Sequence, residues 1–297
     1  MRFHQAISFL SLPDSIELAK AADVQGYAGL YVSDHLFNPR ELQSRYTYSK
    51  APDGSPFWDK DTLCPDPMCL IAGLSTVTTN LLFTTGVYVA PARDIVTVAK
   101  SVGTTAALSN NRVRLGVGVG WCEEEFVATG QNFRNRGKRL DDMIPALRAL
   151  WAGGWVEYHG THYDIPSCQM NPSPSLPIPI YGGGDSDAAL RRATTLCDGW
   201  LTTGAAPPEK AWEQLHKVQD ELHKAGRDNE PFDIYLALHA QPDVDLYRKF
   251  EDAGVTDMMC APWMTTKVSD GISEVERQRA WIEASARFAD DVVQKMA

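Results

Sequence analysis

The sequence predicts an α/β protein built as one domain over residues 1–297, a (β/α)8 TIM barrel with insertions after strands 2 and 4. Short apolar runs alternate about eight times with helical patterns, which is typical of parallel strands joined by helical crossovers. Eight such units fit a closed barrel of 297 residues. A doubly wound open sheet is the alternative architecture that the same alternation allows.

The composition is that of an ordinary globular protein. Hydrophobic residues make up 44% and charged residues 22%, which excludes disordered and fibrous classes. The net charge of −10 argues against nucleic acid or an anionic membrane as partner. The apolar run at the start of the sequence is too short and too mixed to be the core of a signal peptide. The six cysteines form no Cys-x-x-Cys pair. We therefore expect a cytoplasmic protein that acts on a small molecule.

The first strand–helix–strand unit shows the pattern clearly. Residues 3–9 form a short apolar run that predicts a strand. Asp14 and Glu17 have the spacing of a capping box, and Gly26 ends the helix that follows. The strand over residues 28–32 completes the crossover unit.

The remaining elements follow in the same alternation. Strands are predicted over residues 81–89, 113–119, 179–181, 200–202, 232–239 and 256–260. Helices are predicted over residues 67–79, 95–108, 138–151, 186–196, 208–225, 244–253 and 273–295. Pro145 lies inside one helical pattern and predicts a kink or a first turn there.

Two stretches interrupt this alternation. Residues 37–66 follow the second strand and are rich in Pro, Asp, Ser, Lys and aromatic residues. Residues 154–176 have the pattern of an aromatic hairpin followed by a Pro/Ser loop. Long loops in compact domains are usually lids or binding loops. The first stretch lies at the strand ends where barrels keep their active sites.

Asp34 and His35 come directly after the apolar second strand. At the C-terminal end of a barrel strand, this pair indicates an acid, base or hydrogen-bond donor. An equally good interpretation is a structural Asp–His pair that caps the next loop.

Glycines mark three further strand ends. Gly86 interrupts a β-branched run, which indicates a bulge or a close backbone approach to a ligand or, with equal weight, a tight barrel corner. The alternating glycines from Gly116 to Gly120 leave one strand face without side chains, where a flat ring or a tight barrel layer fits equally well. The run Gly182 to Gly184 precedes a helix and predicts a phosphate site rather than a plain turn.

Other chemistry finds little support in the sequence. His159 and His162 lie on the predicted hairpin, where they face opposite sides or bracket a turn, so we expect no metal site. Cys122 has no sequence neighbour that would activate a thiolate. The chain contains no G-x-S-x-G elbow, Walker loop or H-E-x-x-H motif.

Five segments carry a family resemblance when they are taken together and in order. They are GYAGLYVSDH at 26–35, the stretch 99–121, EEF at 124–126, RGKRLD at 136–141 with Leu150-Trp151, and PIYGG at 179–183 with DGW at 198–200. Together they resemble the bacterial luciferase-like superfamily, and most closely its branch that uses the deazaflavin coenzyme F420. The resemblance implies a (β/α)8 barrel that moves a hydride between that coenzyme and an organic substrate.

The resemblance also implies roles for residues at the barrel mouth. Asp34 and His35 would lie near the reactive ring as the catalytic pair, with His35 donating or accepting the proton. Gly86-Val87 would be the bulge behind the ring, often with a non-prolyl cis peptide. The implied coenzyme contacts are Asp34, Thr85, Gly86, Val87, Val117, Gly118, Gly120, Gly182, Gly183 and Gly184.

One departure from that branch bears on the substrate. Its sugar-phosphate dehydrogenases carry an acidic residue near the position of Val119, and Glu123 is only a weak substitute, so that activity is not expected. The insertion is aromatic, and we expect Tyr48, Phe57 and Trp58, with Trp121, to bind a small, fairly apolar substrate.

Two other functions stay open at this point. An FMN-dependent monooxygenase, supplied by a separate reductase, would be expected to have more cations at the phosphate loop. A non-redox barrel could bind a phosphorylated ligand without turning it over. Because relatives are often dimers, we expect a homodimer.

Overall fold

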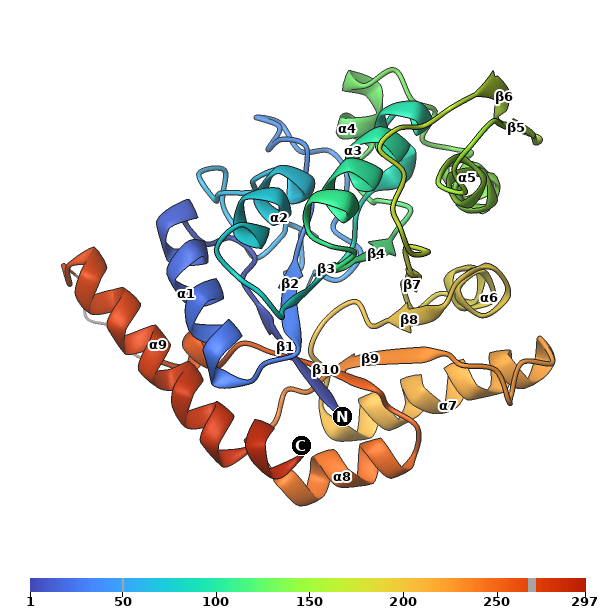
Figure 1. Ribbon diagram of the computed structural model, residues 1–297. Coiled ribbons are helices and arrows are strands. Elements are labelled where there is room, and N and C mark those ends of the chain that lie inside the picture. The colour runs from blue at the N-terminus through green and yellow to red at the C-terminus, as the bar shows by residue number, and fades with distance from the viewer. Residues whose placement is uncertain (50, 267–270) are drawn as a thin grey trace.

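The computed structural model describes residues 1–49, 51–266 and 271–297, and its centre is a closed barrel of parallel strands (Figure 1). The strands pair in the order β1-β2-β3-β4-β7-β8-β9-β10, and β10 pairs with β1 to close the ring. Their bounds are β1 (Arg2–Ala6), β2 (Gly29–Val32), β3 (Leu82–Thr85), β4 (Val113–Val117), β7 (Ile180–Gly183), β8 (Gly199–Leu201), β9 (Asp233–Ala237) and β10 (Asp257–Cys260). The predicted (β/α)8 barrel is therefore confirmed.

Helices surround the barrel and cover its outer face (Figure 1). They are α1 (Leu12–Gln25), α2 (Pro67–Ser75), α3 (Ile95–Leu108), α4 (Glu123–Ala128), α5 (Arg136–Leu150), α6 (Asp187–Leu196), α7 (Pro208–Lys224), α8 (Val244–Asp252) and α9 (Glu274–Asp291), with short 3₁₀ turns η1 (Ala90–Ala92), η2 (Pro262–Thr265) and η3 (Val293–Lys295). None of the helices in these described ranges is long and apolar enough to cross a bilayer.

Several element boundaries differ from the prediction for local reasons. Helix α1 begins earlier because Ser11, not Asp14, is the N-cap and accepts the Asp14 N–H at 3.2 Å. The first strand stops at Ala6 because Phe9 adopts a left-handed φ of 66°. Helix α4 was not predicted, and Pro145 lies inside α5 without ending it.

The third strand also ends early, at Thr85. The Gly86–Val87 peptide bond that follows is cis, as the resemblance implied. Tyr88 then returns to the sheet through a single bridge with Val117 on β4. The chain thus bulges at Gly86-Val87 before it rejoins the neighbouring strand.

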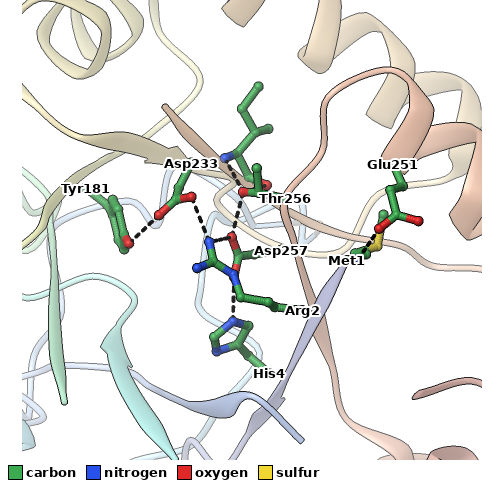
Figure 2. Close-up of polar contacts among 9 residues, drawn as sticks. Met1, Arg2, His4, Tyr181, Asp233, Glu251, Thr256 and Asp257 are labelled. Atoms are coloured by element: carbon green, nitrogen blue, oxygen red, sulfur yellow. Dashed lines mark hydrogen bonds and ion pairs between the residues drawn. The ribbon is translucent and has the colours of Figure 1, made fainter. Parts of the chain in front are cut away.

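The strand N-termini form a polar floor to the barrel (Figure 2). Arg2 bridges two carboxylates, at 2.6 Å to Asp257 and 2.7 Å to Asp233. His4 and Asp257, both fully buried, are 2.6 Å apart, and Tyr181 donates to Asp233 at 2.7 Å. Burial alone would raise the pKa of Asp257, but the hydrogen bonds from His4 and Arg2 outweigh it and lower that pKa. These contacts join β1, β7, β9 and β10.

Both predicted insertions are present. Residues 33–66 connect β2 to α2 without a helix or strand among the described residues. The second forms the antiparallel hairpin β5 (Val156–His159) and β6 (Asp164–Cys168), between α5 and β7. Tyr158 of the hairpin donates to Asp142 of α5 at 2.7 Å, which holds the hairpin outside the barrel wall.

Candidate functional site

A buried carboxylate lies against the histidine that follows β2. Nδ1 of His35 is 3.0 Å from Oε1 of Glu125, and the same oxygen accepts the backbone N–H of Leu36 at 2.9 Å. Glu125 is 1% exposed. Sequence reasoning missed this residue because Glu123, Glu124 and Glu125 are consecutive, and nothing local shows which of them points inward.

Asp34 is fixed by a second buried pair. Arg93 donates to both of its carboxylate oxygens, at 2.6 and 2.7 Å, and the Val89 N–H donates at 2.8 Å. The Arg93 guanidinium also lies 4.2 Å from the centre of the Tyr88 ring. Both carboxylate oxygens of Asp34 are therefore occupied by hydrogen bonds within the protein, which agrees with the structural role that the sequence analysis left open for it. Arg93, another residue that the sequence analysis missed, joins the end of β2 to the segment after β3.

Glu124, directly before Glu125 on α4, anchors the insertion through hydrogen bonds. Glu124 accepts the backbone N–H groups of Gln43 at 2.7 Å and Ser44 at 3.0 Å, and the Ser44 hydroxyl at 2.7 Å. Burial opposes ionisation, but these bonds outweigh it and lower the pKa of Glu124 to about 2. The insertion is thus anchored to the helix that carries Glu125.

Aromatic rings surround His35. The ring of Trp58 is 5.1 Å away and that of Trp121 is 5.7 Å away, measured between centroids. His35, Trp58 and Trp121 line a cavity of about 160 Å³ with Phe37, Leu42 and other residues of the insertion. Phe9, whose left-handed backbone the sequence did not reveal, stacks on Trp58 at 5.3 Å. The site is therefore an aromatic cavity with one imidazole in its wall.

The other two predicted substrate residues lie outside that lining. Phe57 is 75% exposed and packs edge-on against Trp58 at 4.9 Å. Tyr48 lies near Asp185 and Thr203, beyond the ends of β7 and β8. Burial, followed by the nearby Asp185 charge and Tyr46, raises the pKa of Tyr48 to about 12. Of the four predicted substrate residues, Trp58 and Trp121 are therefore the two that lie beside His35.

The glycines at the strand ends are closely packed. A Cβ on Gly118 would lie 2.3 Å from Cγ2 of Val87, and one on Gly183 would lie 2.2 Å from Cγ1 of Val87. A Cβ on Gly86 would lie 1.6 Å from the Tyr31 ring. Gly118 and Gly183 therefore both leave room for the Val87 side chain, which agrees with the tight-layer alternative for the glycine stripe after β4.

Four other predicted coenzyme contacts are buried. The Thr85 hydroxyl donates to the Gly116 carbonyl at 2.9 Å, and the Val117 side chain packs in the layer under the helices. A Cβ on Gly182 would lie 2.8 Å from Ala193 of α6. Gly184 is buried in the turn, and its carbonyl accepts from Trp200 at 2.8 Å. Thr85, Val117 and Gly182 are therefore buried, and their roles as coenzyme contacts stay predictions.

The turn that enters α6 combines N–H donors with one acid. Ser186 is the N-cap of α6 and accepts the Ala189 N–H at 3.3 Å. Asp185 accepts from Thr203 at 2.7 Å and from Gln214 at 3.1 Å, on the side of β8 and α7. Gly183 is partly exposed directly before this turn. The predicted phosphate position thus has a helix N-terminus, with an acidic neighbour held by other side chains.

Comparison with known proteins gives a consistent family. The model of the luciferase-like monooxygenase family matches residues 4–295. An uncharacterized protein of Mycobacterium tuberculosis is 39% identical over 259 residues, covering 87% of this chain and 88% of that protein. An F420-dependent glucose-6-phosphate dehydrogenase of Nakamurella multipartita is 28% identical over 240 residues, covering 80% of this chain and 66% of that protein.

Two solved structures share the fold over the whole chain. The coenzyme F420 dependent tetrahydromethanopterin reductase of Methanopyrus kandleri has a TM-score of 0.72 at 14% identity, covering 100% of this chain and 99% of that chain. The monooxygenase RslO1 of Streptomyces bottropensis has a TM-score of 0.72 at 16% identity, covering 100% of both chains. At these identities the likeness concerns the barrel alone.

Proposed function

The chain belongs to the luciferase-like monooxygenase family, and we propose that it is an oxidoreductase that transfers a hydride between coenzyme F420 and a small, fairly apolar organic substrate. The relatives named as F420-dependent glucose-6-phosphate dehydrogenases support the deazaflavin over FMN. The observation that carries the proposal is His35, paired with buried Glu125, in the wall of an aromatic cavity.

The residues at the mouth fit a planar ring with a phosphorylated tail. Gly86, Val87, Gly120 and Gly183 are partly exposed at the ends of neighbouring strands, and Val87 offers a small apolar surface. We assign the ring to this surface. We assign the phosphate to the N–H groups at the start of α6, which follows Gly183 closely. Asp34 holds the Val89 N–H and so fixes the segment that carries Val87.

The chain's own residues would orient the substrate and move a proton. When bound, F420 supplies the two-electron hydride chemistry. His35 exchanges the proton with the substrate oxygen, while Trp58 and Trp121 exclude water and favour an apolar body. Asp34, whose oxygens are committed to Arg93 and Val89, is a positioning residue in this scheme.

The cavity argues against a sugar phosphate as the substrate. Its described lining holds one cationic side chain, Lys60, which lies beside Asp59 and pairs with Asp61 at 2.8 Å. Phe37, Trp58 and Trp121 supply apolar surface. A phosphate group is bound most strongly by charged donors, and Lys60 with its two acidic neighbours gives this lining no net positive charge.

A coenzyme titration followed by fluorescence quenching tests the proposal. We expect saturable binding of F420 and much weaker binding of FMN. Binding of FMN alone, with oxygen consumption when a separate reductase is added, would replace the proposal with a two-component monooxygenase. Binding of neither, with a melting-temperature rise in sugar phosphates, would replace it with a non-redox phosphate-binding barrel.

A further inference from the structure

We propose that Glu125 is the positioning residue that keeps the proton of neutral His35 on Nδ1, so that Nε2 faces the ligand as a hydrogen-bond and proton acceptor. The role of Nε2 as acceptor of the substrate proton rests on the proposed function, whereas the position of the proton on Nδ1 does not. The site then selects substrates that present a hydroxyl group to His35.

The direction of the hydrogen bond follows from the second donor on the same oxygen. Oε1 of Glu125 accepts the Leu36 N–H at 2.9 Å, so this oxygen acts as an acceptor. A carboxylate has no proton to give, and a protonated carboxyl would carry its proton on the other oxygen. Nδ1 of His35, at 3.0 Å from Oε1, is therefore the donor.

The opposite ring nitrogen is left for a ligand. The imidazole side chain is 13% exposed and lines the cavity beside Trp58 and Trp121. Within residues 1–49, 51–266 and 271–297, no protein group forms a hydrogen bond with Nε2. With the proton on Nδ1, Nε2 carries a lone pair and matches an O–H donor rather than a carbonyl.

The carboxylate also favours the charged ring that results. When the substrate O–H bond breaks, its proton goes to Nε2 and the electron pair stays on oxygen, which becomes the carbonyl oxygen as the hydride leaves carbon for the oxidised deazaflavin. The new imidazolium then lies 3.0 Å from Glu125. This is the same physical device that a buried carboxylate supplies to a catalytic histidine in acyl transfer.

Other titratable groups near His35 do not compete with Glu125. Asp34 is neutralised by Arg93. Burial raises the pKa of Cys64 to about 11 and that of Cys122 to about 12, so both thiols stay neutral near pH 7. In the cavity lining, Asp59 and Lys60 carry opposite charges. The charge in direct contact with the ring is Glu125.

The tautomer can be measured directly in the protein without coenzyme. Long-range ¹H–¹⁵N spectra distinguish Nδ1–H from Nε2–H, and a His35→Gln sample identifies this ring among the seven histidines. We expect Nδ1–H in the wild type and in Glu125→Gln, whose amide oxygen can still accept. We expect loss of the Nδ1–H form in Glu125→Leu. Glu123→Gln, at an exposed position on the same helix, is the matched control and keeps the wild-type spectrum.

Turnover measurements then separate the effect of the Glu125 charge from the effect of the His35 tautomer. Glu125→Gln keeps the tautomer but removes the charge, so kcat falls about tenfold or more and the acidic limb of the pH–rate profile moves. The Kd of F420 stays unchanged. An Nε2–H signal in the wild type, or an unchanged spectrum in Glu125→Leu, overturns the inference. If the tautomer behaves as stated while F420 does not bind, the proposed function fails and the role of Glu125 stands.

Discussion

Arg93 holds Asp34 through two parallel hydrogen bonds, 2.6 and 2.7 Å long, although the two residues are 59 positions apart in the sequence. The Arg93 side chain is 10% exposed and that of Asp34 is fully buried. Burial would lower the pKa of Arg93, but its bonds to Asp34 outweigh this and raise it. Arg93 therefore stays charged, and its two bonds fix the residue next to His35.

The first prediction concerns this pair. Arg93→Leu leaves the Asp34 carboxylate buried without its cation, and we expect a loss of about 3–5 kcal/mol in the free energy of unfolding. Urea unfolding at pH 7 measures it. Arg279→Leu is the control, because its partner Glu283 lies on the exposed face of α9 and such pairs contribute little. Equal stability of the two variants would contradict this account.

The second prediction tests the packing of Val87. Gly183→Ala places a Cβ 2.2 Å from Cγ1 of Val87, so Val87 must shift and coenzyme affinity falls. Val87→Ala removes that atom, and we expect the double variant to recover thermal stability relative to Gly183→Ala alone. Melting curves of the four proteins form a double-mutant cycle. Additive effects in the cycle would show that the two residues do not meet.

The third prediction concerns the barrel floor in Figure 2. Because the pKa of Asp257 is lowered in the folded state, its contribution is present in full above the unfolded value of about 3.9 and is lost as the pH falls through the folded value. Asp257→Asn therefore costs most near pH 7, roughly 3 kcal/mol or more. The gap to wild type narrows below about pH 4. Urea midpoints at pH 7 and pH 3.5 compare the two, and a constant gap would contradict this reasoning.

The barrel could be predicted because its signals are local. An apolar run or a helical pattern can be recognised without knowing which strand it will pair with. The family segments then marked the strand ends in their order along the chain. The glycine at position 86 marked a real bulge for the same reason. Boundaries failed where a single residue left the regular backbone, as Phe9 does after β1.

The contacts of the site could not be predicted in the same way. Glu125 meets His35 across 90 residues, and a run of three glutamates does not reveal which one is buried. The glycine stripe of β4 allowed either an open face or a tight layer, because the sequence does not show that Val87 fills the space beside Gly118. Side-chain partners depend on the three-dimensional arrangement of the loops, and no periodicity records it.

The fourth prediction separates the substrate cavity from the coenzyme surface. Trp58→Leu removes an aromatic wall next to His35, so we expect KM for an apolar substrate to rise about tenfold while the Kd of F420 stays the same. Phe57→Leu is the matched control, because Phe57 is adjacent in the sequence but lies outside the lining. A larger effect of Phe57→Leu on KM would move the substrate to the outer face of the insertion.

The fifth prediction concerns His35 itself. His35→Ala removes the proton acceptor from the cavity but leaves Val87, Gly120 and Gly183 in place, so kcat should fall about 100-fold with little change in F420 affinity. Because Glu125 then loses one of its two donors, stability is measured in parallel by urea unfolding. His35→Gln is a second variant that can keep the donor to Glu125. A loss of turnover in both variants, with F420 titrations unchanged, supports proton transfer. Unchanged turnover in either folded variant removes His35 from the mechanism.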